Sequence, residues 1–267
     1  MGAYDLTGRS ALVTGGARGL GAGMAEALAS AGANVVIGDI QEDLGRATAD
    51  SIKQSGANAA FVHLDVTDDA SWQQAISASI AEVGGLDILV NNAGIEISGL
   101  VADLDPQDVS RMLEVNVLGT SLGVKHAFRA MRPGGAAGNG GAVVNIASVA
   151  ATIAFPGIAG YSATKSAVDR LTRVAAMESG KLGYGVRVNC VYPGLVPTDM
   201  GNQLAADVVQ LGLFPSIEEA IGAVVGQTPS GRLGEVSDMA DAVVFLASDA
   251  ARFITGAGLP VDGGMGM

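Results

Sequence analysis

The stretch SALVTGGARGLG, residues 10–21, begins with five residues typical of a buried strand and ends in a glycine-rich turn. A helical pattern, LGAGMAEALASAG (20–32), follows directly. Glycines let the backbone turn sharply and approach a ligand closely, and the first turn of a helix presents free N–H groups to an anion. A strand, a glycine turn and a helix in this order predict a pyrophosphate-binding unit in a parallel α/β sheet.

The glycines of this turn, Gly15, Gly19 and Gly21, are spaced differently from the strict dinucleotide fingerprint G-x-G-x-x-G. A turn with only a structural role would use the same residues. The context favours ligand binding, because the next strand-like run, NVVIG (34–38), is followed by Asp39 at the distance where a ribose-binding acid belongs.

Two residues near this turn point to different cofactors. Asp39 can accept hydrogen bonds from both ribose hydroxyls and would repel a 2′-phosphate, which favours NAD over NADP. Arg18 could pair with a 2′-phosphate and favours NADP. We give Asp39 the greater weight and expect NAD(H) as the preferred cofactor, with NADP(H) not excluded because of Arg18.

Short runs rich in Val, Ile and Leu recur along the chain. Too apolar for a strand exposed on one side, they are typical of strands covered on both faces, at 10–14, 34–38, 59–64, 86–90, 142–147 and 186–192. Helical patterns lie between them, at 20–32, 70–84 and 108–131. This alternation predicts an α/β chain with one doubly wound parallel sheet of about seven strands, Rossmann-type, flanked by helices on both faces. We expect residues 1–267 to form a single domain, since no interior linker, charge block or repeat divides them.

The composition of the 267 residues narrows the classes of protein. Hydrophobic residues make up 49% and charged residues 16%, which argues for an ordered, well-buried chain. The net charge of −12 disfavours nucleic acid and anionic membranes as partners. The one cysteine, Cys190, lies in an apolar run and is expected to be buried and inert. No secretory signal or membrane-spanning run is recognisable, so we expect a cytoplasmic protein.

Several motifs occur in a fixed order along the chain. They are TGGARGLG (14–21), NNAG (91–94), Ser148, YSATK (161–165), PGLVPT (193–198) and PVDGG (260–264). Each follows a predicted strand or lies on the next helix, at the sheet edge where ligands bind. In these motifs the chain resembles the short-chain dehydrogenase/reductase family in its compact single-domain form, and the resemblance covers nearly the whole sequence.

The residue types suit transfer of hydride between an alcohol carbon and nicotinamide. Such a reaction needs a group that exchanges the hydroxyl proton, and tyrosine is poorly suited at its ordinary pKa of about 10. Tyr161 and Lys165 lie one helical turn apart. An ammonium at ~4 Å contributes roughly 4 kcal/mol at an effective dielectric of ~20, or ~3 pKa units. We therefore expect Lys165 to bring Tyr161 near neutrality and Ser148 to donate to the substrate oxygen.

The family resemblance assigns further roles. It implies that Lys165 also binds the nicotinamide ribose, that Asn116 holds a water in a proton relay to the lysine, and that Asp65 binds the adenine. Val196 and Thr198 would grip the carboxamide. The complete set of expected cofactor-binding residues is Gly15, Arg18, Gly19, Leu20, Gly21, Asp39, Ile40, Asp65, Val66, Asn91, Ala93, Gly94, Tyr161, Lys165, Pro193, Gly194, Val196 and Thr198.

The resemblance also bears on assembly and metals. Members of the family commonly form tetramers by pairing two long helices, which here would be 108–131 and 161–178, so we expect a homotetramer. His63 and His126 have no acidic or cysteine partner at ligand spacing, and we expect no metal site.

The segment 197–226 would cover the substrate in this family. Its apolar residues Met200, Leu204, Val208, Leu211, Leu213 and Phe214, with Ile95, Ile97, Val149 and Phe155, could line an apolar pocket or could only pack the segment against the sheet. We expect Ser148, Glu96, Phe155, Leu195, Met200 and Leu204 to contact the substrate. Glu96 is the odd polar group, which either binds a second hydroxyl or faces solvent.

The function expected from these residues is interconversion of a secondary alcohol and a ketone with NAD(H), on an apolar cyclic or steroid-like skeleton. One alternative is a 3-oxoacyl-carrier-protein reductase. Met177 opposes it, because those reductases usually carry a basic residue there for carrier docking. Asp39 opposes it as well, because they generally prefer NADPH. A second alternative is a nicotinamide-binding sensor without catalysis, which the intact set Asn116, Ser148, Tyr161 and Lys165 opposes.

Overall fold

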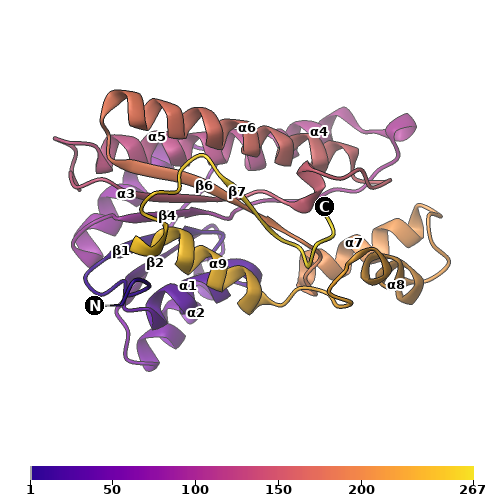
Figure 1. Cartoon of the computed structure of the whole chain (residues 1–267), viewed down its shortest axis with the longest axis horizontal. Coiled ribbons are helices and arrows are strands. Elements are labelled where there is room, and N and C mark those ends of the chain that lie inside the picture. The colour runs from indigo at the N-terminus through magenta and orange to yellow at the C-terminus, as the bar shows by residue number, and fades with distance from the viewer. Residues whose placement is uncertain (1) are drawn as a thin grey trace.

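A single parallel sheet organises the computed structural model, which describes residues 2–267 (Figure 1). Within these residues the strand order is β3-β2-β1-β4-β5-β6-β7, and each neighbouring pair is parallel. The strands are β1 (Ser10–Thr14), β2 (Asn34–Asp39), β3 (Ala59–His63), β4 (Ile88–Asn91), β5 (Gly141–Ile146), β6 (Val186–Pro193) and β7 (Gly258–Val261). This confirms the predicted doubly wound α/β sheet. The chain reverses its direction of winding between β1 and β4, and such a point opens a crevice at the carboxyl ends of the strands.

Helices cover both faces of the sheet (Figure 1). One face carries α1 (Gly19–Ser30), α2 (Glu42–Gln54) and α9 (Val236–Ala247), and the other carries α3 (Asp69–Val83), α4 (Pro106–Met112), α5 (Gly119–Met131) and α6 (Ala159–Leu182). In the described part of the chain, three short 3₁₀ turns join other elements: η1 (Val101–Asp103), η3 (Val149–Ala151) and η4 (Asp249–Ala251). No helix among residues 2–267 combines the length and apolarity needed to cross a membrane.

The burial of both faces explains why the strands read as continuous apolar runs. In β1, Leu12 belongs to the core beneath α3 and α5, whereas Val13 belongs to the core beneath α1 and α9. Neither side chain is exposed at all. Because successive strand residues point to opposite faces, a two-sided core favours apolar residues at consecutive positions of a strand.

The long helix expected at 108–131 is interrupted. Between α4 and α5 lies a π-helical segment, η2 (Leu113–Leu118), in which the Gly119 N–H bonds to the Glu114 carbonyl five residues earlier. Asn116 lies inside this segment. Its side chain accepts from the Ile95 N–H and donates to the Ile95 carbonyl, each at 2.9 Å. A wide turn of this kind adds a residue without ending the helix, so the apolar pattern of the sequence does not reveal it.

Two helices extend beyond the carboxyl ends of the strands (Figure 1). These are α7 (Asp199–Gln210) and α8 (Ile217–Gln227), which lie within the segment expected to cover a substrate. In the connection between them, Phe214 stacks on Phe155 with ring centroids 6.3 Å apart. Aromatic stacking of this kind holds the covering segment against the loop that follows β5.

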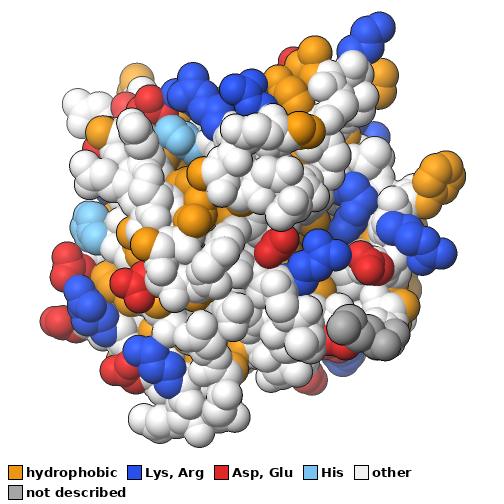
Figure 2. Space-filling model, turned by 90° about the vertical axis from the view of Figure 1, so that its left-hand side faces the viewer, with side chains coloured by type: hydrophobic (Ala, Val, Ile, Leu, Met, Phe, Trp, Pro, Cys, Tyr) orange, Lys and Arg blue, Asp and Glu red, His pale blue; other side chains and the backbone are white. Residues whose placement is uncertain are grey.

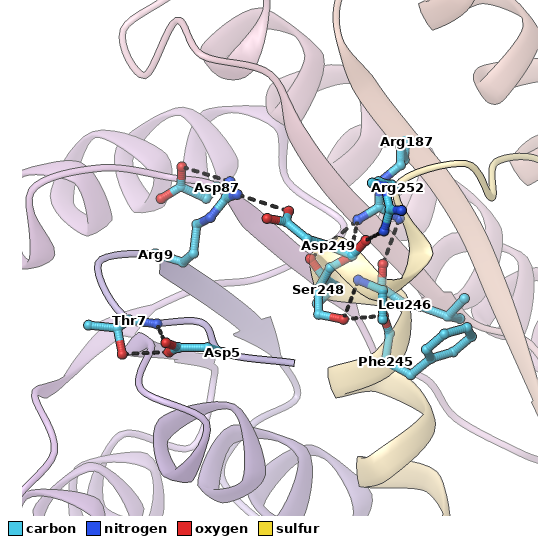
Figure 3. Close-up of polar contacts among 12 residues, drawn as sticks. Asp5, Thr7, Arg9, Asp87, Arg187, Phe245, Leu246, Ser248, Asp249 and Arg252 are labelled. Atoms are coloured by element: carbon cyan, nitrogen blue, oxygen red, sulfur yellow. Dashed lines mark hydrogen bonds and ion pairs between the residues drawn. The ribbon is translucent and has the colours of Figure 1, made fainter. Parts of the chain in front are cut away.

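Charged side chains fasten the opposite edge of the sheet, where the strands begin (Figure 3). Arg9 pairs with Asp249 at 3.2 Å. Arg187 donates to the carbonyls of Leu246 at 2.7 Å and of Ser248 at 3.2 Å, which satisfies the free end of α9. Acidic and basic side chains are interspersed over this side of the molecule (Figure 2). These ion pairs and hydrogen bonds therefore lie at the end of the sheet opposite the carboxyl ends of the strands.

Candidate active site

A cavity of about 530 Å³ opens at the carboxyl edge of the sheet, a volume in the range of small-molecule sites. Most residues predicted for the site line it. They are Gly15, Arg18, Gly19, Leu20, Asp39, Ile40, Asp65, Val66, Ala93, Gly94, Glu96, Ser148, Phe155, Tyr161, Lys165, Pro193, Gly194, Leu195, Val196, Thr198, Met200 and Leu204. The folded chain thus brings together motifs that are up to about two hundred residues apart.

Three predicted residues do not line the cavity. A side chain at Gly21 would collide with the Gly15 carbonyl, so this glycine serves close packing of the turn. The Asn91 amide donates to Asn145 Oδ1 at 2.8 Å and is buried beside α5, away from the expected adenosine site. The third, Asn116, lies behind the cavity wall and is described below.

Asn92, which the sequence did not single out, occupies the position expected of its neighbour. Its Nδ2 donates to the carbonyls of Thr14 and Gly15, each at 3.0 Å, and its backbone N–H bonds to Thr14 Oγ1. This side chain ties the end of β4 to the glycine turn. Alternation along the strand determines which of two consecutive asparagines faces the cavity, and the doublet NN contains no signal for that choice.

The first part of the cavity suits a dinucleotide. The helix α1 begins at Gly19 with no side-chain cap and no acidic residue in its first turn, so its N–H groups and positive end are free for a pyrophosphate. Gly19 has a φ of +57°, which favours glycine, and a Cβ there would make only van der Waals contact with Thr198 Cγ2, at 3.8 Å. These residues fit the group that the sequence implies.

Asp39 is buried at the end of β2 and is held by backbone groups. Its Oδ2 accepts from the Ala17 N–H and its Oδ1 from the Gln41 N–H, both at 3.0 Å. Each oxygen keeps a lone pair for a ribose hydroxyl. Because both oxygens are fixed, the carboxylate cannot turn away from a ligand placed beside it.

Arg18 is engaged by a partner on the covering segment. Its Nη1 lies 2.8 Å from Asp199 Oδ2, although both side chains are largely exposed. Asp199 is the first residue of α7, directly after Thr198, which caps that helix by accepting from the Gly201 N–H. The ion pair therefore joins the glycine turn to the covering segment across the cavity. Asp199 lay outside the predicted set, and an acid at the start of a helix is too common to be a signal.

Ser148, Tyr161 and Lys165 meet at one wall of the cavity. Tyr161 belongs to the first turn of α6, and Lys165 follows one turn later with its Nζ 5.5 Å from the Tyr161 ring centroid. The Lys165 ammonium is buried and donates to the Ile146 carbonyl at 2.8 Å. Ser148 Oγ accepts from the Ala150 N–H at 3.1 Å, which caps η3. The predicted constellation of hydroxyl, phenol and ammonium is therefore assembled.

The expected acidification of Tyr161 is wrong for the chain alone. Burial raises the pKa of Tyr161 to about 12, an effect that its hydrogen bond with Ser148 reduces and the charge of Glu96 increases. Burial also lowers the pKa of Lys165 to about 8. The simple distance argument fails because removing the phenol from water disfavours the phenolate more than the Ser148 hydrogen bond favours it. The phenol is accordingly a proton donor at neutral pH.

Asn116 fixes the backbone beside the catalytic wall. Its Oδ1 accepts from the Ile95 N–H, and its Nδ2 donates to the Ile95 carbonyl and to Thr164 Oγ1 at 3.0 Å. A Cβ on Gly94 would lie 3.2 Å from this Oδ1 and 3.4 Å from Lys165 Nζ. Both Nδ2 hydrogens are used by protein groups, and the relay expected from the family resemblance stays a prediction.

The remaining part of the cavity is apolar. Its lining side chains are Ile95, Val149, Ala150, Ile153, Phe155, Ile158, Leu195, Met200, Leu204, Val224 and Met265. Five of the apolar residues considered from the sequence, Ile97, Val208, Leu211, Leu213 and Phe214, lie outside it. Val208, Leu211 and Leu213 instead surround Gly157 and pack the covering segment down. Val224 lies in the expected covering segment and Met265 directly follows PVDGG, but neither residue was singled out, because the sequence does not show which apolar side chains of these stretches face the cavity.

Other reactive side chains lie elsewhere. Cys190 is fully buried, and burial raises the pKa of its thiol to about 11. His126 contacts Asp69 at 2.7 Å and stacks on Trp72. Among residues 2–267 there is no group of three or more His, Cys, Asp or Glu side chains arranged to hold a metal ion.

Known proteins resemble this chain over nearly its full length. A family model described as enoyl-(acyl carrier protein) reductase matches residues 15–266. A trans-4-hydroxycyclohexanecarboxylate dehydrogenase from Sinomonas cyclohexanicum is 42% identical over 260 residues, which span 95% of this chain and 91% of that protein. A 3-alpha-(or 20-beta)-hydroxysteroid dehydrogenase from Mycobacterium tuberculosis is 38% identical over 259 residues, spanning 97% and 90%.

A solved structure agrees with the fold. A gluconate 5-dehydrogenase from Burkholderia cenocepacia J2315, in complex with NADP and tartrate, is 35% identical and superposes with a TM-score of 0.88. The alignment covers 98% of this chain and 97% of the other.

Proposed function

The chain belongs to the short-chain dehydrogenase/reductase family and is an alcohol oxidoreductase, and we propose that it interconverts a secondary alcohol and a ketone on an apolar cyclic or steroid-like skeleton with NAD(H). One observation carries the proposal: Ser148, Tyr161 and Lys165 border a cavity whose far part is almost entirely apolar. The names of two relatives, which describe a hydroxycyclohexanecarboxylate and a hydroxysteroid, support a ring-shaped substrate.

The proposed mechanism uses the phenol as the proton-transfer group. Ser148 donates a hydrogen bond to the substrate oxygen, and Tyr161 gives its proton to that oxygen in ketone reduction and takes it back in alcohol oxidation. Lys165 stabilises the phenolate by its charge, from 5.5 Å above the ring. A bound nicotinamide cofactor would supply the two-electron carrier and, in its oxidised form, a positive charge that favours the phenolate.

Burial determines the protonation states of Tyr161 and Lys165. Since burial raises the pKa of Tyr161 to about 12 and lowers that of Lys165 to about 8, both groups are protonated at neutral pH. A protonated phenol beside an ammonium is ready to protonate a developing alkoxide. The residues therefore favour ketone reduction at neutral pH, and alcohol oxidation requires the added positive charge of the oxidised cofactor.

NAD(H) is the cofactor that the charges favour. Asp39 is held by two backbone N–H groups and would face a 2′-phosphate with a fixed negative charge. Arg18, the group that could compensate, is paired with Asp199 at 2.8 Å. The NADP bound in the gluconate dehydrogenase belongs to that protein and makes the comparison of both cofactors essential.

The decisive experiment is a substrate screen with both cofactors. The purified chain is mixed with NAD or NADP and with cyclohexanol, cyclopentanol or a hydroxysteroid, and reduced cofactor is followed by its absorbance. We expect turnover of at least one cyclic alcohol and a higher kcat/KM with NAD. Absence of turnover with every cyclic alcohol of the screen would refute the proposed substrate class, and a higher kcat/KM with NADP would refute the cofactor assignment.

A carrier-protein reductase is the second candidate, because the matching family model is described as an enoyl-(acyl carrier protein) reductase. Met177, at the position where a basic docking residue was expected for the carrier, is exposed on α6. An apolar side chain there gives an acidic carrier no cation to bind. Faster turnover of acetoacetyl or enoyl thioesters than of cyclic ketones would favour this candidate.

We also propose that the protein is a cytoplasmic homotetramer. Apolar side chains are exposed along η2 and α6, among them Leu113, Leu118, Val174 and Met177. Covering such a surface by a second copy would remove apolar area from water. Light scattering tests the assembly, and a monomer would contradict it.

A further inference from the structure

Glu96 is the one carboxyl side chain in the apolar part of the cavity, as far as residues 2–267 describe it. The other acids that line the cavity, Asp39, Asp65 and Asp199, belong to the part suited to the dinucleotide, at the ends of β2 and β3 and at the start of α7. A lone carboxyl among aliphatic and aromatic side chains is unfavourable unless a polar partner meets it. Its presence therefore needs an explanation.

The backbone holds Glu96 in a defined position. The preceding residue, Ile95, is bonded on both its N–H and its carbonyl by the Asn116 amide. On the other side of Glu96, the N–H of Gly99, three residues after it, bonds to the Gly157 carbonyl at 2.7 Å. Because both ends of this short segment are fixed, Glu96 is presented to the cavity by a supported loop.

Only one side of the Glu96 carboxyl is satisfied. Ser98 Oγ donates to Oε1 at 2.9 Å, and no hydrogen bond or ion pair within residues 2–267 involves Oε2, which is accessible from the cavity. Burial raises the pKa of Glu96 to about 7, the Ser98 hydrogen bond counters this, and the charge of Asp207 on α7 adds to it. Glu96 and Tyr161 line the same cavity, and the charge of this carboxyl adds to the raised pKa of Tyr161.

We propose that Glu96 binds a second oxygen of the substrate, so that the enzyme selects a cyclic diol or hydroxyketone over a cyclic mono-alcohol. The reacting oxygen would meet Ser148 and Tyr161, and the second hydroxyl would meet Oε2 of Glu96. A hydroxyl can donate to a carboxylate or accept from a carboxylic acid, so it suits Glu96 in either protonation state. A substrate carboxylate would instead be repelled by ionised Glu96. This inference rests on the proposed function and specifies its substrate class.

The test compares three substrates in alkaline buffer, where Glu96 is ionised: cyclohexanol, cyclohexane-1,2- or 1,4-diol, and 4-hydroxycyclohexanecarboxylate. We expect the parent enzyme to prefer a diol over cyclohexanol by about 10- to 100-fold in kcat/KM, the range for a hydrogen bond to a charged group. Glu96→Leu should remove that preference, and Glu96→Gln should keep most of it because the amide still forms hydrogen bonds. Glu96→Gln should raise kcat/KM for the carboxylate substrate.

The directions of these changes distinguish recognition from damage to the fold. A variant that merely loses structure lowers the rate with all three substrates, whereas the proposal requires the diol and the carboxylate to respond in opposite directions. Glu82→Leu, which removes an exposed glutamate from α3, is the matched control and should leave the substrate ratios unchanged. An equal diol to mono-alcohol ratio in parent and Glu96→Leu would overturn the inference alone. Failure to oxidise any cyclic alcohol would overturn the proposed function with it.

Discussion

The Asn116→Ala substitution tests whether the hydrogen-bonded wall behind the cavity serves catalysis as well as folding. Asn116 is 1% exposed and makes three side-chain hydrogen bonds, two to the Ile95 backbone and one to Thr164. At about 1 kcal/mol each, their loss costs about 3 kcal/mol of the free energy of unfolding. For a chain of this size that lowers Tm by roughly 6–12 °C. Releasing Ile95 also frees the loop carrying Gly94 and Glu96, and a displacement near 1 Å costs about 100-fold in kcat/KM.

Asn145→Ala is the matched control. Asn145 is fully buried in β5, accepts from Asn91 and donates to Thr172, and does not line the cavity. It should lose about 2 kcal/mol of stability with little change in kcat/KM. Thermal unfolding followed by circular dichroism gives the stabilities, and cyclic-alcohol oxidation is measured below the lower Tm. If the two folded variants retain similar kcat/KM values, Asn116 has no role beyond folding and the reasoning is refuted.

Four other substitutions or conditions probe the site. Tyr161→Phe should lower kcat by ~10²- to 10⁴-fold with cofactor affinity nearly intact in fluorescence titration, and a parent-like rate would remove the phenol from the mechanism. Because burial lowers the pKa of Lys165 to about 8, the ammonium is present below that pH and lost above it. Ketone reduction should therefore slow as pH rises through about 8 and Lys165→Arg should shift the fall upward; a flat pH–rate profile would contradict this. Gly94→Ala places a Cβ against Asn116 and Lys165 and should lower kcat/KM by ~10-fold. Unchanged kinetics would contradict this prediction. Asp39→Asn should improve the NADP to NAD ratio of kcat/KM by ~30- to 100-fold, and an unaltered ratio would show that Asp39 does not discriminate.

The pattern of apolar residues in the sequence was sufficient to predict the architecture of the sheet. The apolar runs at 10–14 and 186–192 correspond to β1 and β6 to within a residue, because a strand buried on both faces is mostly apolar at consecutive positions. The run at 86–90 extends beyond its strand, since β4 starts at Ile88. The buried stretch is therefore longer than the hydrogen-bonded strand, because Leu86 is buried although it takes no part in the hydrogen bonding of the sheet.

The site was predictable where a motif lies next to a strand end, and not where tertiary packing decides. Ser148, Tyr161 and Lys165 converge as expected, because the carboxyl edge of the sheet collects the residues after each strand. The pKa of Tyr161 was not predictable, because it depends on burial by residues spread along the chain. Nor was the contribution of Met265, whose position is known only once the chain has folded.

A change of chain length in the π-helical turn η2 would have opposite effects on the regularity of the helix and on the integrity of the cavity wall. The wide turn contains one residue more than regular α-helical winding would need. A deletion of one residue within 113–118 would therefore let α4 and α5 fuse into a continuous rod, gaining regular hydrogen bonds while rotating Asn116 away from its loop. Shortening the chain here would exchange the three hydrogen bonds of Asn116 for regular helical ones and would release the cavity wall, so a library aimed at thermostability should leave the length of this turn unchanged.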